Sequence, residues 1–383
     1  MGTKLQAVRA EFGWSQARLI AELRRRAALE GTALGSDASV KTEISRHENG
    51  RVSPHPAWRQ LYRAAYGRTD EELGFIEPGL ETVKLVETEE LSARLASSAA
   101  LSMAEVHLLA RQVDQIRTLD RQLGAHAVLD QLRNLIGTVN ALRNYSFRPS
   151  IREALAALLA DAGALAGWQA LDIGSIGQAW LHYETAKEAA REAASPALLA
   201  HAMAEQAILL LEVGEAQNAV ELIQAARGVN AKRGPPLLTA WLHATEGEAH
   251  SVTGADRNCR NALETAAARI PRDTTDPALP FIFLDEPHMA RWRGNCLARL
   301  GDERAIDALT AALARMDSSF ARAEAGLRCD LAQAMIIRGD LTEANAQALR
   351  SRQIAMRVGS VRQRRRIERL VSRARLARDA RSP

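Results

Sequence analysis

A repeated spacing of glycines in the second half of the chain constrains the fold more than any other feature of the sequence. Successive glycines lie 40, 40, 47 and 38 residues apart, and a small residue follows each of them by four or five positions. The segments between them are rich in alanine and leucine, which favour helices. We therefore expect helix–turn–helix units in which the second helix packs closely on the first. The glycines are Gly174, Gly214, Gly254, Gly301 and Gly339, and the small residues are Ala179, Ala219, Cys259, Ala305 and Ala344.

One helix pair cannot bury its apolar face alone, so successive pairs must stack into a superhelix. The pattern resembles the tetratricopeptide (TPR) class of α-solenoid, with units longer than the ~34 residues usual for that class. The resemblance implies an all-α fold in which residues 96–383 form a TPR-like helical repeat domain for sensing and dimerisation. The 47-residue interval contains a non-helical insertion at 272–280, and a helix from Gly359 to Arg378 is expected to cap the stack.

The first 78 residues have a different organisation, built around a short polar helix that ends at Asn49-Gly50. This helix carries Ile44 inward, and the helix before it begins after Ser15, a favourable N-cap. Arginine and lysine suit the edges of guanine in a major groove, whereas serine and threonine suit bases or phosphates. The outward side chains have these chemistries and are Lys41, Thr42, Ser45 and Arg46.

These features resemble the helix-turn-helix of the phage repressor/Cro (XRE) family. The matching residues are Ser15-Gln16, Leu19-Ile20, Ile44-Ser45-Arg46 and Glu48-Asn49-Gly50-Arg51. The resemblance implies a five-helix DNA-binding domain over residues 1–78, with an ion pair between Arg9 and Glu48. It implies base contacts from Lys41, Thr42 and Arg46, and contacts to the DNA backbone from Gln16, Ser45 and Arg51. Gln16 is expected either to face a phosphate or to brace the recognition helix.

The connection between the two helices of this motif is longer than the family's turn of about four residues. Residues from Arg24 to Asp37 intervene here, so we expect the second helix to continue to Leu29 and the recognition helix to be capped at Ser36 or Asp37. Residues 79–95, which follow Pro78 and have a charged middle, are predicted to be the linker between the two domains.

Charge is distributed unevenly along the chain. The net charge is +4, but residues 357–383 contain ten arginines and two acids, Glu368 and Asp379, so the rest of the chain totals −4. Most of the chain is therefore not a nucleic-acid surface. The arginine-rich tail could contact DNA phosphates, although a solvated outer face on the capping helix is the favoured interpretation.

The remaining composition indicates a protein of the cytoplasm. The N-terminus lacks an apolar signal core, and no apolar run reaches the roughly 20 residues that span a bilayer, so no membrane partner is expected. Cys259, Cys296 and Cys329 are far apart and odd in number, which predicts neither a disulfide framework nor a metal site. No nucleophile elbow, phosphate-binding loop or zinc-protease motif is present, so we expect no enzyme activity and no cofactor.

The densest polar and aromatic cluster in the repeat domain lies at 281–295. At helical spacing Asp285, His288 and Trp292 share one face, as do Arg291 and Asn295. The cluster predicts one of two things: a concave pocket for an effector, or a polar seam that fixes the inserted loop to its helix.

The whole layout resembles the regulators that join an XRE-type head to a TPR body, including the RRNPP peptide-sensing group. The resemblance implies a transcriptional regulator that binds double-stranded DNA as a homodimer on symmetric half-sites. It also implies a peptide, small-molecule or protein effector in the concave groove of the solenoid. The alternative is a TPR-based adaptor that binds a protein partner and for which DNA binding is weak or secondary.

Overall fold

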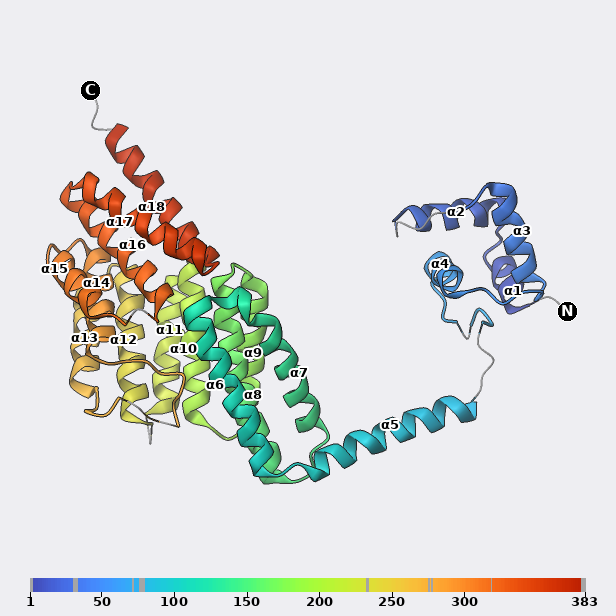
Figure 1. Ribbon diagram of the computed structural model, residues 1–383, viewed down its shortest axis with the longest axis horizontal. Coiled ribbons are helices and arrows are strands. Elements are labelled where there is room, and N and C mark those ends of the chain that lie inside the picture. The colour runs from blue at the N-terminus through green and yellow to red at the C-terminus, as the bar shows by residue number, and fades with distance from the viewer. Residues whose placement is uncertain are drawn as a thin grey trace. The chain divides into compact units, whose positions relative to one another are not determined.

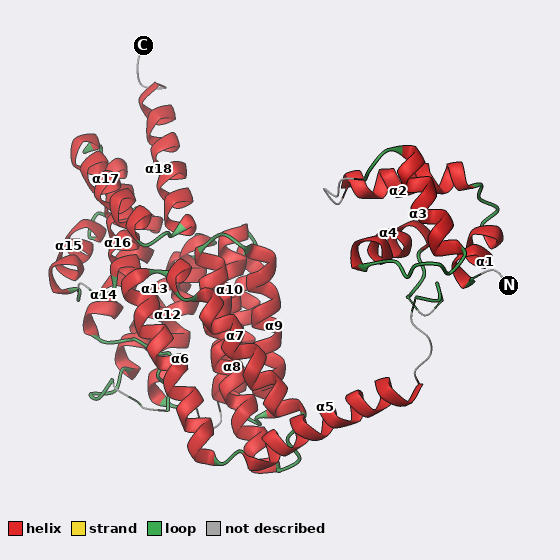
Figure 2. Cartoon of the chain, turned by 45° about the vertical axis from the view of Figure 1, so that its right-hand side comes forward, coloured by secondary structure: helices red, strands yellow, loops and turns green. Residues whose placement is uncertain are grey.

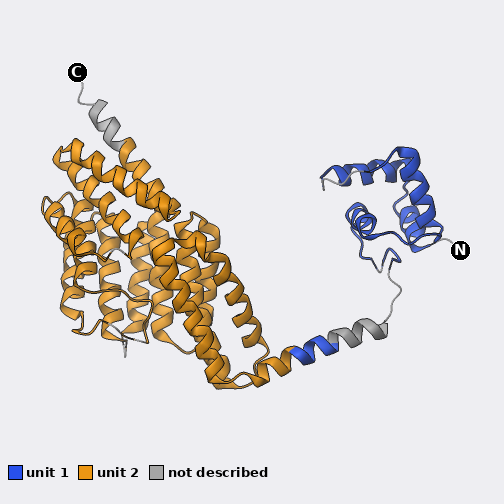
Figure 3. Cartoon of the chain, in the orientation of Figure 1, with its two compact units in different colours: residues 1–93 blue, residues 94–383 orange. Residues whose placement is uncertain are grey.

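The chain was analysed as a computed structural model that describes residues 3–29, 34–70, 72–75, 80–231, 234–274, 276, 278–317 and 319–379. The side chains of residues 80–87 and 373–379 are outside this description. Over the described residues the fold is all-α, with helices and loops and no strand, as the sequence predicted (Figure 2). The chain divides into two compact units, Met1–Ala93 and Arg94–Pro383 (Figure 3).

Unit 1 contains four helices around one small core. Leu19, Leu23, Ile44 and Tyr62 are almost fully buried in it. Ser36 caps the third helix, since its hydroxyl accepts from the Ser39 amide at 3.3 Å. After the fourth helix, Thr69 and Glu72 form the hydrogen bonds of a capping box and open a single further turn. The helices are α1 (Lys4–Glu11), α2 (Gln16–Leu29), α3 (Asp37–Glu48) and α4 (Pro56–Tyr66).

The segment predicted to be the linker is helical. Helix α5 (Leu80–Ala100) covers most of residues 79–95, and the division between the two units falls inside it, at Ala93. Besides its charged residues the segment contains leucine and alanine, which favour a helix. The last turn of α5 belongs to unit 2, where the Ser98 hydroxyl donates to the Leu142 carbonyl at 3.2 Å.

Unit 2 is a superhelix of antiparallel helix pairs (Figure 1). Each of the five repeat glycines has a positive φ, between +73° and +91°, and turns the chain from the first helix of a pair to the second. The small residue after each glycine is buried, which allows the close crossing that the sequence predicted. The pairs are α8 (Pro149–Asp172) with α9 (Ile176–Glu192), α10 (Pro196–Val213) with α11 (Ala216–Asn230), α12 (Pro236–Val252) with α13 (Asp256–Arg269), α14 (Glu286–Leu300) with α15 (Ala305–Arg315), and α16 (Ala321–Arg338) with α17 (Leu341–Arg357).

The two ends of the superhelix meet. Before the first pair come α6 (Met103–Leu123), a short 3₁₀ turn at Ala125–Ala127 and α7 (Leu129–Asn144), and after the last pair comes α18 (Val361–Asp379). Helix α18 packs on α16 and α17 as a capping helix should, but it also contacts α8, and α16 contacts α6. The inner helices therefore line a shared space, where the family resemblance implied a concave groove.

A glycine sits where the two ends touch. Gly124, at the end of α6, has φ +88°, and a Cβ built there would lie 1.9 Å from the carbonyl oxygen of Val358, at the end of α17. Only glycine fits this contact, both for its backbone conformation and for the space available.

Two helices of unit 2, α8 and α10, are long and apolar enough by length and composition to cross a membrane, with hydropathies of 1.4 and 1.3. Core helices pass the same test, and 72% of the apolar window of α8 and 44% of that of α10 are buried inside unit 2.

Candidate functional sites

The first candidate site is the outward face of α3. Lys41, Thr42, Arg46 and the following Arg51 are exposed, and Ser45 is half-buried on the same side, while Val40 and Ile44 point into the core. These side chains are held only weakly by their own domain. Arg46 pairs with Glu43 at 3.1 Å on the surface, and the Thr42 hydroxyl donates to the Ala38 carbonyl at 2.9 Å.

The buried end of α3 is fixed to α1 and α2 through one carboxylate. Arg9 donates two hydrogen bonds to Glu48, from Nε at 2.5 Å and from Nη2 at 3.0 Å. Gln16 donates a third, from Nε2 at 3.1 Å. Arg9 and Glu48 are the two residues that the family resemblance implied as a pair. Of the two roles expected for Gln16, the side chain occupies the bracing one, so the orientation of α3 depends on Glu48.

The arginine run at the end of α2 is bound inside the domain. Arg24 pairs with Asp37 at 2.5 Å and donates to the Gly35 carbonyl at 2.6 Å, which fastens the long connection to α2. Arg25 and Arg26 both pair with Glu22, at 2.6 and 2.8 Å. These cations thus have carboxylate partners, unlike Lys41.

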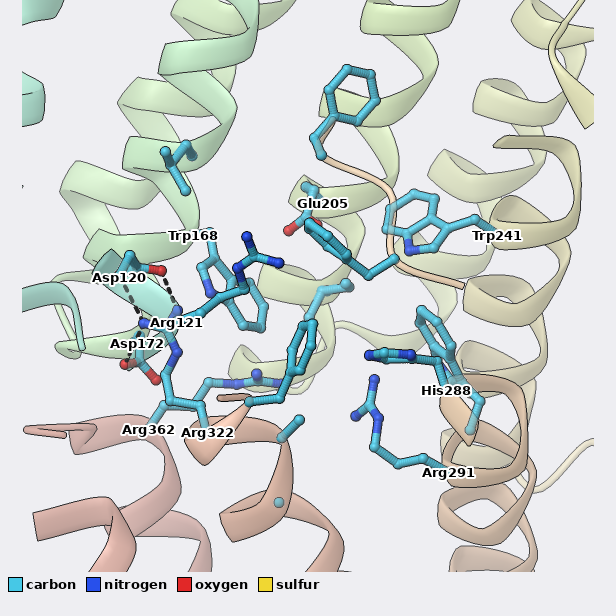
Figure 4. A pocket seen from close by; sticks show the side chains of 18 of the residues that line it. Asp120, Arg121, Trp168, Asp172, Glu205, Trp241, His288, Arg291, Arg322 and Arg362 are labelled. Carbon is cyan, nitrogen blue, oxygen red and sulfur yellow. Dashed lines mark hydrogen bonds and ion pairs between the residues drawn. The ribbon is translucent and has the colours of Figure 1, made fainter. Parts of the chain in front are cut away.

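The second candidate site is a cavity of about 240 Å³ inside unit 2, between the inner helices and the inserted loop (Figure 4). His288, Arg291, Trp292 and Asn295, predicted as effector residues, all line it. The fifth, Asp285, does not. Its carboxylate caps α14 by accepting from the His288 amide at 2.9 Å and also binds His288 Nδ1 at 2.6 Å. For Asp285 the structure therefore favours the polar-seam alternative.

A buried ion cluster closes one side of the cavity. Arg322 of α16 binds Asp120 of α6 at 2.9 Å and Asp172 of α8 at 3.4 Å, and the Ser360 hydroxyl donates to Asp172 at 2.5 Å. Burial opposes the charge of Arg322, but the two carboxylates raise its pKa above the ordinary value. This cluster joins four segments of the chain, at Asp120, Asp172, Arg322 and Ser360.

The arginine-rich helix α18 contributes to the cavity wall as well. Arg362 pairs with Glu212 at 2.6 Å and lies over the Trp168 ring at 5.1 Å from its centroid, and Arg366 pairs with Asp330. Neither the phosphate role nor the solvated role expected for this tail describes these two arginines. Burial by itself would raise the pKa of the Glu212 carboxyl group, but the neighbouring Arg362 lowers this pKa to about 2.

Two other cations of the cavity have no carboxylate partner among the described residues. Arg121 stacks over Phe283 at 4.3 Å and Phe320 at 5.3 Å from the ring centroids. Arg291 lies 5.2 Å from the centroid of its neighbour Trp292, and its Nε is buried with no hydrogen-bond partner. Burial lowers the pKa of both guanidinium groups. Figure 4 shows both side chains reaching into the cavity.

Burial shifts two titratable groups of the cavity, so that at pH 7 Glu205 is about half-protonated and His201 is neutral. Burial raises the pKa of Glu205 to about 7 and lowers that of His201 to about 3. Tyr183 donates to Glu205 at 3.4 Å, and His201 approaches the same carboxyl group at 3.8 Å without being charged. Burial also lowers the pKa of His288, so its imidazole is uncharged too.

Most of the cavity residues were not found by sequence reasoning. Phe281 and Phe283 belong to the predicted cluster, but Arg121, Trp168, Glu205 and Trp241 come from other repeats. The period itself was the available signal, because side chains at equivalent positions of successive inner helices face the same space. Among the described residues no group of three or more His, Cys, Asp and Glu side chains is placed to hold a metal ion.

No family model matches the chain, and no curated protein matches its sequence. Several solved structures resemble it weakly, among them the following two. One is BtubC (BKLC) from P. vanneervenii, with 17% identity over 62% of this chain and 91% of that one, at a TM-score of 0.37. The other is PlcR of Bacillus thuringiensis in complex with the peptide PapR7 and DNA, with 15% identity over 77% of this chain and 92% of that one, at a TM-score of 0.38. Likenesses at this level decide nothing about the function of this chain.

Proposed function

We propose that the protein is a sequence-specific DNA-binding transcriptional regulator whose unit 2 dimerises and binds an effector. The observation that carries the proposal is the outward face of α3. It is a polar, cationic surface on a helix whose opposite side is fixed by the Arg9–Glu48–Gln16 hydrogen bonds. A helix that contacts base edges must be held in one orientation, and this arrangement provides that.

The dimensions of α3 suit a major groove. Its 12 residues span about 18 Å, and the groove is about 12 Å wide. Lys41, Thr42 and Arg46 would contact bases, whereas Ser45 and Arg51 would contact phosphates and set the register. Gln16 would act indirectly, by keeping Glu48 and therefore α3 in place.

The cavity in unit 2 is the proposed effector site. An effector bound there would change the shape of unit 2 only if it bound one shape more tightly than another. In a homodimer such a change would alter the spacing of the two DNA-binding units. We place this activity in the cytoplasm and assign the protein no catalytic role.

Selection of bound sequences from a random pool of DNA duplexes, using the purified full-length protein, tests the proposal. We expect enrichment of a pseudo-palindrome whose half-sites are centred about 10 base pairs apart. Enrichment of a single short site would retain base recognition and contradict the symmetric dimer. The absence of any enrichment at low salt, where phosphate contacts are strongest, would contradict the proposal and favour the adaptor.

The adaptor alternative predicts a different outcome. A solenoid that binds a protein partner does not depend on the outward face of α3, so replacing Arg46 should leave its binding unchanged.

A further inference from the structure

We propose that the cavity of unit 2 binds a small organic monoanion that carries a flat apolar group, with its carboxylate on Arg291. This deepens the effector role assigned to unit 2 and rests on it only for its biological meaning. The binding itself is a property of the cavity and can be measured without DNA.

Six arginines and six carboxylic acids line the cavity, and what favours an anionic ligand is a buried cation without a direct carboxylate contact. Four of the arginines, Arg117, Arg322, Arg362 and Arg366, are paired with carboxylates. Of the other two, Arg121 donates to the Thr118 hydroxyl at 3.3 Å, whereas Arg291 Nε is buried without a partner among the described residues. A buried guanidinium without a carboxylate is costly, because burial disfavours its charge and leaves N–H groups without acceptors. A ligand carboxylate would supply the missing acceptors.

Arg121 contributes at longer range. It stacks over Phe320, whose ring lies 4.9 Å from that of His288, three residues before Arg291 on α14. An anion bound at Arg291 would also be attracted by the charge of Arg121 without touching it. A charge-assisted hydrogen bond from Arg291 is roughly twice as strong as a neutral one.

The rest of the wall suits a flat apolar group. Aromatic rings from five elements face the cavity, and Trp241 meets Trp292 edge to face at 6.3 Å. Rings in such positions bind planar groups by stacking and by burying apolar surface. The aromatic lining residues are Trp168, Trp241, Phe281, Phe283, Trp292 and Phe320.

One polar group offers a further contact. His288 Nδ1 lies against the Asp285 carboxylate and so carries the proton of the neutral ring, which leaves Nε2 as an acceptor. Nε2 is buried and has no partner among the described residues. A hydroxyl or amide N–H of the ligand could donate to it.

The size of the cavity favours a compact ligand. Its volume is about 240 Å³. The volume lies just below the usual range of about 300–1,000 Å³ for pockets that hold drug-sized molecules. A metabolite with one ring and one carboxylate is the size that fits.

The test uses a matched pair of probes, 3-phenylpropionate and its neutral amide, titrated into the full-length protein in a calorimeter at pH 7.5. We expect the carboxylate to bind with a Kd of about 1 mM or tighter, as its size allows, and the amide at least tenfold more weakly. Equal affinity for the two probes, or no binding of the carboxylate at 10 mM, would overturn the proposal.

Variants then locate the site. Arg291→Met should weaken binding of 3-phenylpropionate about 10- to 100-fold, the loss expected for charge-assisted hydrogen bonds, and Arg121→Met should also weaken it. The matched control is Arg293→Met, on the same helix but exposed, which should bind like the wild type. Equal losses in the Arg291 and Arg293 variants would overturn the assignment.

Thermal unfolding without probe separates a binding role from a structural one. Since Arg291 has no carboxylate partner, Arg291→Met should keep or raise the melting temperature, and a marked decrease would contradict the proposal. Failure of the DNA selection would refute the proposed regulator and leave the calorimetric result standing, so the two failures are distinguishable.

Discussion

Replacing Arg322 by methionine should destabilise unit 2 by about 3–5 kcal/mol, the usual cost of removing one partner from a buried ion pair. The side chains of Asp120 and Asp172 are each only 2% exposed, and that of Arg322 is 10% exposed. The variant therefore leaves two carboxylates inside the protein without a cation. At this degree of burial water does not screen these charges appreciably.

Urea unfolding of the full-length protein, followed by circular dichroism at 222 nm, measures this loss. The triple variant Asp120→Asn, Asp172→Asn, Arg322→Met removes the whole cluster and should recover most of the stability, because buried ion clusters contribute little beyond an apolar replacement. Arg293→Met, which removes an exposed arginine of α14, is the control and should change stability by less than about 0.5 kcal/mol.

Two results would refute this reasoning. A loss below about 1 kcal/mol for Arg322→Met would mean that α16 does not close on α6 and α8 in solution. A triple variant as unstable as the single one would mean that the cost is lost packing, not unpaired charge.

Three further changes have defined outcomes. Since the folded pKa of Glu205 is about 7 and its ordinary value is 4.5, the folded state binds the extra proton and stability falls as pH rises from 4.5 to 7. Glu205→Gln removes this fall, so the variant should gain about 3 kcal/mol relative to wild type between pH 4.5 and 8; urea unfolding at several pH values checks this, and a constant difference would contradict it. His201 gives the opposite pH dependence of stability, because its ring is neutral in the folded state. It is present in both the wild type and the variant, so it does not affect the difference between them. Glu48→Gln should destabilise unit 1 by about 2 kcal/mol, because Arg9 loses its charged acceptor, and weaken DNA binding; an unchanged urea midpoint for unit 1 would refute the bracing role. Gly124→Ala should cost unit 2 more than about 2 kcal/mol, since alanine tolerates neither the positive φ nor the contact with Val358, and faster hydrogen exchange in α18 should accompany the loss.

The helix pairs could be predicted from the sequence because their signals are local. Each repeat glycine ends one helix, and the small residue four or five positions later allows the second helix to cross it, so both features lie within one turn of the chain. In unit 1 the spacing around Ile44 similarly predicted which side of α3 is buried. The bracing position of Gln16 needed the structure, because a phosphate contact was an equally good expectation.

The closure of the superhelix could not be predicted in this way. Arg322 and Asp120 are 202 residues apart, and no local sequence pattern predicts that they pair. The same holds for Arg362 and Arg366, whose place in an arginine-rich segment suggested a solvated surface. Once the ends meet, they face an interior where each needs a carboxylate, and residues from distant repeats become the wall of one cavity.

The central claim, that the outward face of α3 contacts bases, is tested most directly by repeating the selection of bound DNA duplexes with Arg46→Ala. The control is Arg68→Ala, an exposed arginine after α4 whose partners are Glu11 and Glu72. We predict that Arg46→Ala loses its preference at one base position of each half-site, with a loss of about 1–3 kcal/mol on the wild-type sequence, while Arg68→Ala keeps the wild-type sequence. An unchanged preference in Arg46→Ala, or the same change in both variants, would contradict the account.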